Sequence, residues 1–411
     1  MNASKSTLWC VLLLVAHNVT FSTLLPGWGN RILAQTESAA PSASTEEIAP
    51  DESPIEPESP EFRTASKELL EHLKVMREII VRYNVSTNKP QDDELREKWL
   101  ELTPRAHELH AKMIDAALAE YLSDPAGKAA IAGMLRRFVL RNIEVERYEG
   151  VLDVALALIE NGDQGELEKT QVVLTAIAVN RYDVALNFVE QILASLTSKE
   201  QAEEKTHYLR MRERIEHMSA NWERELKLRA EDAAGEPLPR VLIRTPKGTM
   251  EIELFENQAP GNVANFISLV ERGFFDGLLF HKVVEKVGIQ TGCPLNDGTG
   301  DDGYHIYGES NRPDARSFFR GYLGMALAGG DIDTASTQFF INTLPSDVLG
   351  ETYTAFGRVI KGFETMSDLT KINPDSEDEE KKNAGAIPDP ILSIEVLYKR
   401  DHEYVPNKVE H

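Results

Sequence analysis

The sequence predicts a multidomain protein in which an all-α, solenoid-like helical bundle precedes a closed eight-stranded antiparallel β-barrel capped by two helices. Three observations support this prediction. The chain has 411 residues, enough for two domains of ordinary size. Apolar residues recur at helical spacing over residues 63–232, where glycine and proline are sparse. Over residues 238–400 apolar positions alternate in short runs between turn residues, which is typical of strands.

The charge balance and the cysteine content limit the possible partners and sites. Lys and Arg total 44 against 67 Asp and Glu, which gives a formal net charge of −23. Nucleic acids and anionic membranes need a basic face, so neither is expected as the main partner. The two cysteines, Cys10 and Cys293, are too few for a disulfide scaffold or a cysteine-rich zinc site.

The first 34 residues have the composition of a targeting segment. They contain two bases and no acid, and the apolar run Leu8–Ala16 is about half the length that spans a bilayer. With Ala34 as the small residue before cleavage, the pattern predicts a signal peptide over 1–34 and export to a periplasm, a lumen or the medium. An N-terminal membrane anchor is the alternative. After removal of the signal, no stable membrane span is expected.

Residues 35–62 form a predicted disordered, acidic, proline-rich linker. The segment holds eight acids, five prolines and no base. Its few apolar side chains cannot bury enough surface to offset the entropy lost on ordering.

The helical domain is predicted over 63–232, with six or seven helices and a solvated charged helix over 198–229. Asp124-Pro125 is a typical helix start. Similar segments begin at Arg147 and Arg181, 34 residues apart, which is the period of tetratricopeptide hairpins. The four residues from Asp153 match those from Asp183 at an offset of 30 instead. The region is therefore predicted as a helical bundle, with a solenoid as the alternative. Such a domain could hold a client or dock a protein partner.

The strand-rich domain, 238–400, follows a boundary at 235–239 and precedes a tail, 401–411. A hairpin is predicted first, then a helix beginning at Ala259, further strands and a short helix near 363–372. The acidic loop 374–382 is predicted as a solvated insertion. The eight strand candidates are Val241–Thr245, Thr249–Phe255, Leu279–Val284, Val287–Thr291, Tyr322–Leu327, Gln338–Thr343, Ala355–Ile360 and Ile391–Tyr398.

Long motifs in this domain resemble a known family. The segments GTMEIELFENQAPGNVANFISLVERGFFDGLLFHKVV, IQTG, GMALAGGDIDTASTQFFINT and AFGRVIKG occur in order. Together they resemble the cyclophilin family of peptidyl-prolyl cis-trans isomerases over about 160 residues. The arrangement of a helical front half and a barrel resembles the thylakoid-lumen and bacterial multidomain cyclophilins.

The chemistry of such a site can be stated from the reaction. Rotation about an X–Pro bond meets a barrier of ~20 kcal/mol because the amide is stabilised by resonance. A site must grip the proline ring in an apolar hole and place a hydrogen-bond donor near the prolyl nitrogen, which favours the twisted transition state. No metal, nucleotide or other cofactor is expected.

The resemblance implies a role for particular positions. Lys282 stands where the family has its catalytic arginine, and Gln290 is expected to hold the substrate backbone. The substrate-binding positions carried over in the same way are Phe280, Val287, Met325, Ala326, Leu327, Gln338, Phe340, Val348, Leu349 and Tyr353.

Several of these positions depart from the family's pattern. Lys282 lacks the planar fork of arginine, so the exchange is not conservative. Val287 replaces a phenylalanine, Gly288 a methionine and Val348 a tryptophan, which thins the walls of the hole. Two hypotheses follow: an isomerase that assists the folding of exported, proline-containing, unfolded or partly folded proteins, or a catalytically weak chaperone scaffold with a helical protein-interaction domain.

Overall fold

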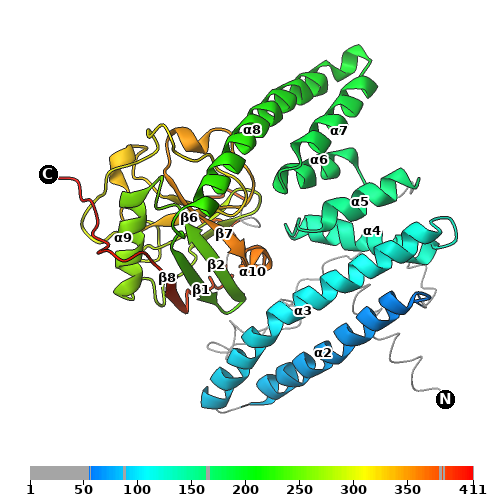
Figure 1. Cartoon of the computed structure of the whole chain (residues 1–411), viewed down its shortest axis with the longest axis horizontal. Helices are drawn as coiled ribbons and strands as arrows, with labels where there is room; N and C mark the ends of the chain where they lie inside the picture. Colours follow the sequence, from blue (N-terminus) through cyan, green and yellow to red (C-terminus); the bar gives the residue numbers. More distant parts are fainter. Residues whose placement is uncertain are drawn as a thin grey trace. The chain divides into compact units, whose positions relative to one another are not determined.

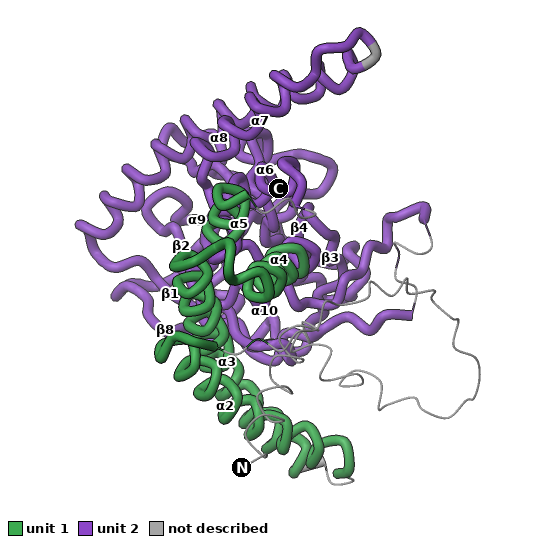
Figure 2. Tube along the Cα trace, turned by 90° about the vertical axis from the view of Figure 1, so that its right-hand side faces the viewer, with its two compact units in different colours: residues 1–142, 153–166 green, residues 143–152, 167–411 purple. Residues whose placement is uncertain are grey.

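The computed structural model describes residues 55, 57–86, 89–162, 167–378, 382 and 385–410 (Figure 1). The predicted signal peptide and most of the predicted acidic linker lie outside these ranges. The chain divides into two compact units, and Figure 2 colours them separately. Unit 1 takes residues 1–142 and 153–166, and unit 2 takes residues 143–152 and 167–411.

Unit 1 is helical. It holds α2 (Pro60–Val85), α3 (Lys89–Ser123) and most of α4 (Ala129–Glu144) and α5 (Val151–Glu160). The predicted apolar stripe of α2 is buried at Leu69 and Met76. The helix begins three residues earlier than predicted, because Ser59 caps it by accepting a hydrogen bond from the Phe62 amide (3.2 Å) and Pro60 fits the first turn.

Unit 2 begins its helical part with α6 (Lys169–Ala178) and α7 (Tyr182–Ser195), which pack together. A short 3-10 turn, η1 (Lys199–Gln201), leads into α8 (Ala202–Ala234). The described residues therefore contain seven α-helices between 60 and 234, which confirms a helical N-terminal half. No described helix combines the length and the apolar character needed to cross a membrane. The tetratricopeptide-like repeat stays a prediction.

The strands of unit 2 form one antiparallel sheet with the order β3-β4-β6-β5-β7-β2-β1-β8. Two helices, α9 (Pro260–Glu271) and α10 (Phe363–Asp368), accompany it, as predicted. The strands are β1 (Arg240–Thr245), β2 (Gly248–Leu254), β3 (Lys282–Val284), β4 (Gly288–Thr291), β5 (Tyr322–Met325), β6 (Phe339–Asn342), β7 (Ala355–Lys361) and β8 (Ser393–Tyr398).

The prediction of a closed barrel is wrong, because the sheet is an open half-barrel. The edge strands β3 and β8 form no ladder with each other in the described residues. An isolated bridge joins Leu279 to Pro390 just outside them. The outer edge of β3 is occupied instead by Ile372, because Val283 and Ile372 exchange backbone hydrogen bonds at 2.7 and 2.9 Å, so β8 does not pair with the three-residue β3.

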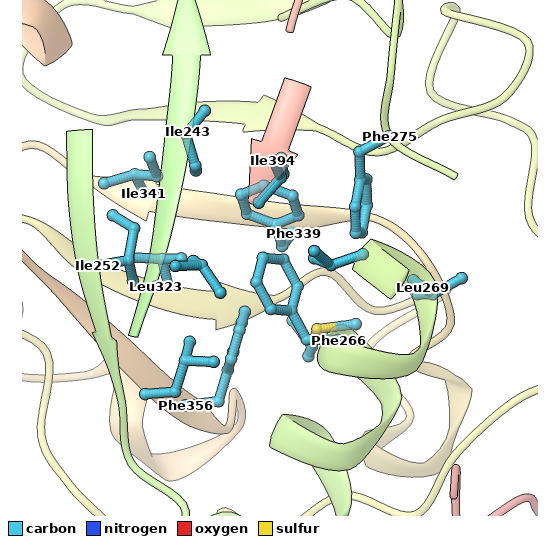
Figure 3. Close-up of a cluster of buried hydrophobic side chains, with 14 of the residues drawn as sticks. Ile243, Ile252, Phe266, Leu269, Phe275, Leu323, Phe339, Ile341, Phe356 and Ile394 are labelled. Atoms are coloured by element: carbon cyan, nitrogen blue, oxygen red, sulfur yellow. The ribbon is translucent and has the colours of Figure 1, made fainter. Parts of the chain in front are cut away.

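The core of the sheet lies between its inner face and α9 (Figure 3). Phe266 projects from α9 and has ring centroids 5.2–5.3 Å from Phe275, Phe339 and Phe356. Four apolar residues on one face of α9 are buried: Val263, Phe266, Ile267 and Val270. This cluster fixes the strands that carry the candidate site.

The long helix α8 belongs to the same unit as the sheet and packs against the segment that precedes β5. Arg316 is fully buried and its guanidinium forms ion pairs with Glu225 (2.7 Å) and Asp232 of α8. Trp222 of α8 meets Phe319 edge to face, with ring centroids 4.9 Å apart. A charged contact and an aromatic contact therefore anchor α8 to the segment before β5.

Candidate active site

A row of side chains crosses four neighbouring strands. Lys282 of β3 pairs with Gln290 of β4, Gln290 pairs with Phe340 of β6, and Phe340 pairs with Gly324 of β5. Residues directly opposite one another in an antiparallel sheet lie on the same face. The residues one position along each strand belong to the buried core: Val283, Ile289, Ile341 and Leu323. The row therefore lies on the face of the sheet opposite to the core.

Aromatic side chains form an apolar floor at one end of this row. The Phe340 ring stacks on Phe318 (centroids 5.5 Å apart) and meets Tyr353 edge to face (5.3 Å). Gly324 makes room for the pair, since a Cβ at this position would overlap Phe340 Cζ and lie 2.8 Å from Phe318 Cζ. Phe318 and Gly324 were not predicted as site residues, because the sheet register brings Gly324 to Phe340 and ring stacking in the folded chain brings Phe318 there.

Two glutamines stand beside the aromatic floor. Gln290 Nε2 donates to Gln338 Oε1 at 2.9 Å, and Gln338 Nε2 donates to the carbonyls of Gly298 and Gly300, both at 2.9 Å. The amide of Ala326 donates to the Gln338 carbonyl at 2.9 Å. Hydrogen bonds thus hold both amide side chains in place next to the row, where they can pair with a peptide backbone.

Lys282 is the cationic hydrogen-bond donor that the resemblance predicts for the site, and its ammonium forms an ion pair. Nζ lies 2.6 Å from Oδ2 of Asp375, and the Lys282 side chain is 34% exposed. Asp375 belongs to the acidic loop that the sequence predicted only as a solvated insertion. The two residues are 93 positions apart, so no spacing in the sequence indicates this contact.

The remaining predicted positions divide into core residues and wall residues. Phe280 and Met325 belong to the buried core cluster and so support the site from behind. Val287 and Val348 are 61% and 58% exposed. Leu327 is half-buried and packs against the core, and Leu349 is half-buried at the start of the 3-10 turn η3 (Leu349–Glu351). The structure therefore brings Lys282, Gln290, Gln338, Phe340, Tyr353 and Ala326 together, but not Phe280 and Met325.

An ion pair from α8 holds the loop that carries two of the wall positions. Arg214 donates to the carboxylate of Asp347 at 2.7 and 2.9 Å, and Asp347 directly precedes Val348 and Leu349. The Arg214 hydrogen bond lowers the pKa of Asp347. The helical part of unit 2 therefore positions one edge of the candidate site.

The residues assembled here suit a reaction that makes no covalent bond. An aromatic floor can receive a proline ring, side-chain amides can hold the flanking peptide, and an ammonium can donate to a nitrogen. Within the described ranges, no group of three or more His, Cys, Asp or Glu side chains is placed to hold a metal ion.

Comparisons with known proteins identify the family of the strand-rich part. The family described as cyclophilin type peptidyl-prolyl cis-trans isomerase/CLD matches residues 240–395. A peptidyl-prolyl cis-trans isomerase of Synechococcus elongatus is 40% identical over 121 residues, which cover 29% of this chain and 80% of that protein. Peptidyl-prolyl cis-trans isomerase B of Bacillus subtilis is 41% identical over 121 residues, 29% of this chain and 82% of that protein.

A solved structure is also similar. The crystal structure of a cyclophilin type peptidyl-prolyl cis-trans isomerase of Cryptosporidium parvum is 31% identical and has a TM-score of 0.34, covering 39% of this chain and 99% of that one. The matched family region begins at β1 and ends within β8, so helices α2–α8 lie outside it. Through its strand-rich part, the chain belongs to the family of cyclophilin-type peptidyl-prolyl cis-trans isomerases.

Proposed function

We propose that this isomerase acts on proline-containing, unfolded or partly folded exported proteins, with Lys282 as the hydrogen-bond donor to the prolyl nitrogen. One observation carries the proposal: Lys282, Gln290 and Phe340 stand in register across three strands on one face of the sheet. A cation, an amide and an aromatic ring thus lie on neighbouring strands of one face, within reach of a single prolyl peptide.

Each group has a separate task in the proposed reaction. Phe340 and Tyr353 receive the proline ring, and Gln290 holds the carbonyl and amide groups of the flanking peptide. The Lys282 ammonium donates to the prolyl nitrogen as it becomes pyramidal during rotation. This hydrogen bond is stronger in the twisted state than in either planar state, so it lowers the barrier rather than only binding the substrate.

An isomerase assay on the full chain with a proline tetrapeptide tests the donor. Lys282→Ala should lower kcat/KM by roughly 100- to 1,000-fold, the range for losing one hydrogen-bond donor to the transition state. Lys282→Arg should raise it, because arginine offers a planar fork. Lys399→Ala is the matched control, since Lys399 is a similarly half-exposed lysine that pairs with Glu271. Full activity in Lys282→Ala would exclude Lys282 as the donor.

A binding scaffold is the second candidate function. The contact between Lys282 and Asp375 and the two exposed valines favour it, because an occupied donor and thin walls both weaken catalysis. In this case the site binds proline peptides without turnover, and the helical region 63–232 holds the client or docks a partner. Fluorescence anisotropy of a labelled peptide, measured beside the isomerase assay, separates the two: binding without turnover supports the scaffold.

The proposed export rests on the composition of residues 1–34. N-terminal sequencing of the protein from its native cells should find a chain that begins near residue 35. A chain that keeps Met1 and remains in the cytoplasm would contradict export, and it would leave the isomerase proposal untouched.

A further inference from the structure

Unit 2 contains a cavity of about 370 Å³ that is separate from the candidate active site. Its walls come from α8, β7, the start of α10, the start of β5 and the segment before it, the connection between α6 and α7 with the end of α6, and the segment before α5. None of the residues that line it belongs to the row across β3, β4, β6 and β5. Four of the lining side chains decide its chemistry: Trp222, Arg320, Arg358 and Phe363.

Arg320 is the central group of this cavity. Its side chain is only 2% exposed, and one terminal nitrogen, Nη2, donates to the Glu146 carbonyl at 2.7 Å. The other terminal nitrogen, Nη1, has no hydrogen-bond acceptor in the described part of the chain. A buried N–H without an acceptor is destabilising, so this donor is suited to a group supplied from outside the chain.

A second guanidinium offers donors in the same cavity. Arg358 of β7 donates through Nη2 to Glu253 at 2.6 Å. Its Nη1 lies 3.8 Å from the Glu225 carboxylate, an ion pair beyond hydrogen-bond distance, and neither Nη1 nor Nε has a hydrogen-bond acceptor among the described residues. Two guanidinium groups whose N–H donors are not all used in hydrogen bonds favour an oxyanion, since the planar fork of arginine matches carboxylate and phosphate oxygens.

Aromatic rings give the cavity flat apolar walls. Trp222 of α8 lies under the Arg229 guanidinium, whose central carbon is 4.6 Å from the ring centroid. Phe363 stands 5.2 Å from the guanidinium carbon of Arg320. The volume is much larger than the ~30 Å³ that one water occupies, and it falls in the range of about 300–1,000 Å³ for small-molecule sites.

We propose that this cavity binds a small aromatic oxyanion, a ring that carries a carboxylate or a phosphate. The ring packs between Trp222 and Phe363, and the anionic oxygens accept from Arg320 and Arg358. Glu149 also lines the cavity, and its carboxylate lies 3.2 Å from Arg320 Nε with 40% of the side chain exposed. The ligand therefore competes with Glu149 for Arg320, so removing the charge of Glu149 should tighten binding.

Isothermal titration of the full chain tests the proposal, with phenyl phosphate and benzoate as probes and phenol as the uncharged control. Both anions should bind and phenol should not; the tighter of the two identifies phosphate or carboxylate as the preferred group. Glu149→Gln should tighten binding about three- to tenfold, because it removes both the competing charge and a like-charge repulsion. Arg320→Gln should weaken it at least about tenfold.

Two further measurements keep the test decisive. Arg244→Gln changes a surface arginine that pairs with Glu395 on another part of the sheet, and should leave binding unchanged. Since Arg320 also holds the Glu146 carbonyl, folding of Arg320→Gln is checked by circular dichroism; if it is lost, the tighter binding of Glu149→Gln decides alone. No heat with either anion at millimolar concentration, or equal binding by Glu149→Gln and the natural chain, overturns the proposal.

Discussion

Asp375 forms an ion pair with Lys282, the proposed hydrogen-bond donor. Its carboxylate lies 2.6 Å from Lys282 Nζ, and both side chains are partly solvated. A substrate nitrogen has to attract the ammonium away from this carboxylate. Exposed ion pairs of this kind are weak and screened by salt, so if Lys282 is the donor we expect the contact to lower the rate without abolishing it.

Asp375→Asn should therefore raise kcat/KM by up to roughly fivefold, the size expected for losing an exposed ion pair. The increase should shrink as salt rises, because salt already weakens the pair in the natural chain. The proline-tetrapeptide assay at low and high salt measures both effects. Glu377→Gln removes the same charge from an exposed position in the same loop and should change little. An equal gain in both variants would attribute the effect to the general field of the loop.

Gly324 gives a second prediction for a single residue. A Cβ here would overlap Phe340 Cζ, so Gly324→Ala must displace the aromatic floor. We expect the KM for proline peptides to rise about tenfold and the free energy of unfolding to fall by about 1–3 kcal/mol, as for an overpacked site. Peptide titration and urea unfolding measure the two quantities.

Gly350→Ala is the matched control for this change. A Cβ at Gly350 would lie 3.6 Å from its nearest neighbours, which is ordinary contact distance. Unchanged peptide affinity in Gly324→Ala would show that the Phe340 ring does not form the floor of the site.

At the scale of elements, alternation and turn residues were sufficient to predict all eight strands, within a few residues of their ends. The open edge of the sheet was not predictable from periodicity, because Ile372 covers β3 through a pairing with Val283 that joins positions far apart in the sequence. The start of α2 was missed because the acidic, proline-rich composition around Ser59-Pro60 concealed a normal cap.

One connecting segment holds the turn next to the site. Glu146 lies between α4 and α5, is buried, and accepts a hydrogen bond from the Lys286 amide in the β3–β4 turn. It also pairs with Lys371 Nζ at 2.8 Å. Lys286 directly precedes Val287, a predicted wall residue, so a carboxylate from the helical part of the sequence positions this wall.

Glu146→Ala should therefore loosen the turn and lower the free energy of unfolding by about 3 kcal/mol, since it leaves a lysine and an amide without their buried acceptor. Hydrogen exchange of the Lys286 amide should become faster, and the KM for proline peptides should rise. Glu285→Gln changes an exposed carboxylate in the same turn and serves as control. If the Lys286 amide stays equally protected in Glu146→Ala, Glu146 does not hold the turn.

At the scale of the whole molecule, sequence composition marks where helix gives way to strand but not which elements pack together. Arg316 and its partners Glu225 and Asp232 have the residue types of any charged surface, yet all three are buried together. They are 84–91 positions apart, so no local pattern pairs them. The family motifs predicted Gln290 and Phe340 as site residues. They did not predict Asp375 and Arg214, which contact Lys282 and Asp347 only in the folded chain.

The pH dependence of stability combines two histidines with opposite effects. Burial lowers the pKa of His281, which lies near Asp297, Lys282 and Asp375. Below its ordinary pKa of about 6.5, the unfolded chain takes up a proton that the folded chain resists. His281 therefore makes the free energy of unfolding fall as the pH drops below this value.

His402 acts in the other direction. Its hydrogen bonds to the Glu403 carbonyl and the Glu256 carboxylate raise its pKa, so its stabilisation is complete below about pH 6.5 and is lost as the pH rises through the folded pKa. Urea unfolding between pH 5 and 8 should therefore show a flatter acid side in His281→Gln and a steeper one in His402→Gln. Each variant removes one imidazole. If the free energy of unfolding of both variants changes with pH in the same way as that of the natural chain, neither histidine determines the pH dependence of stability.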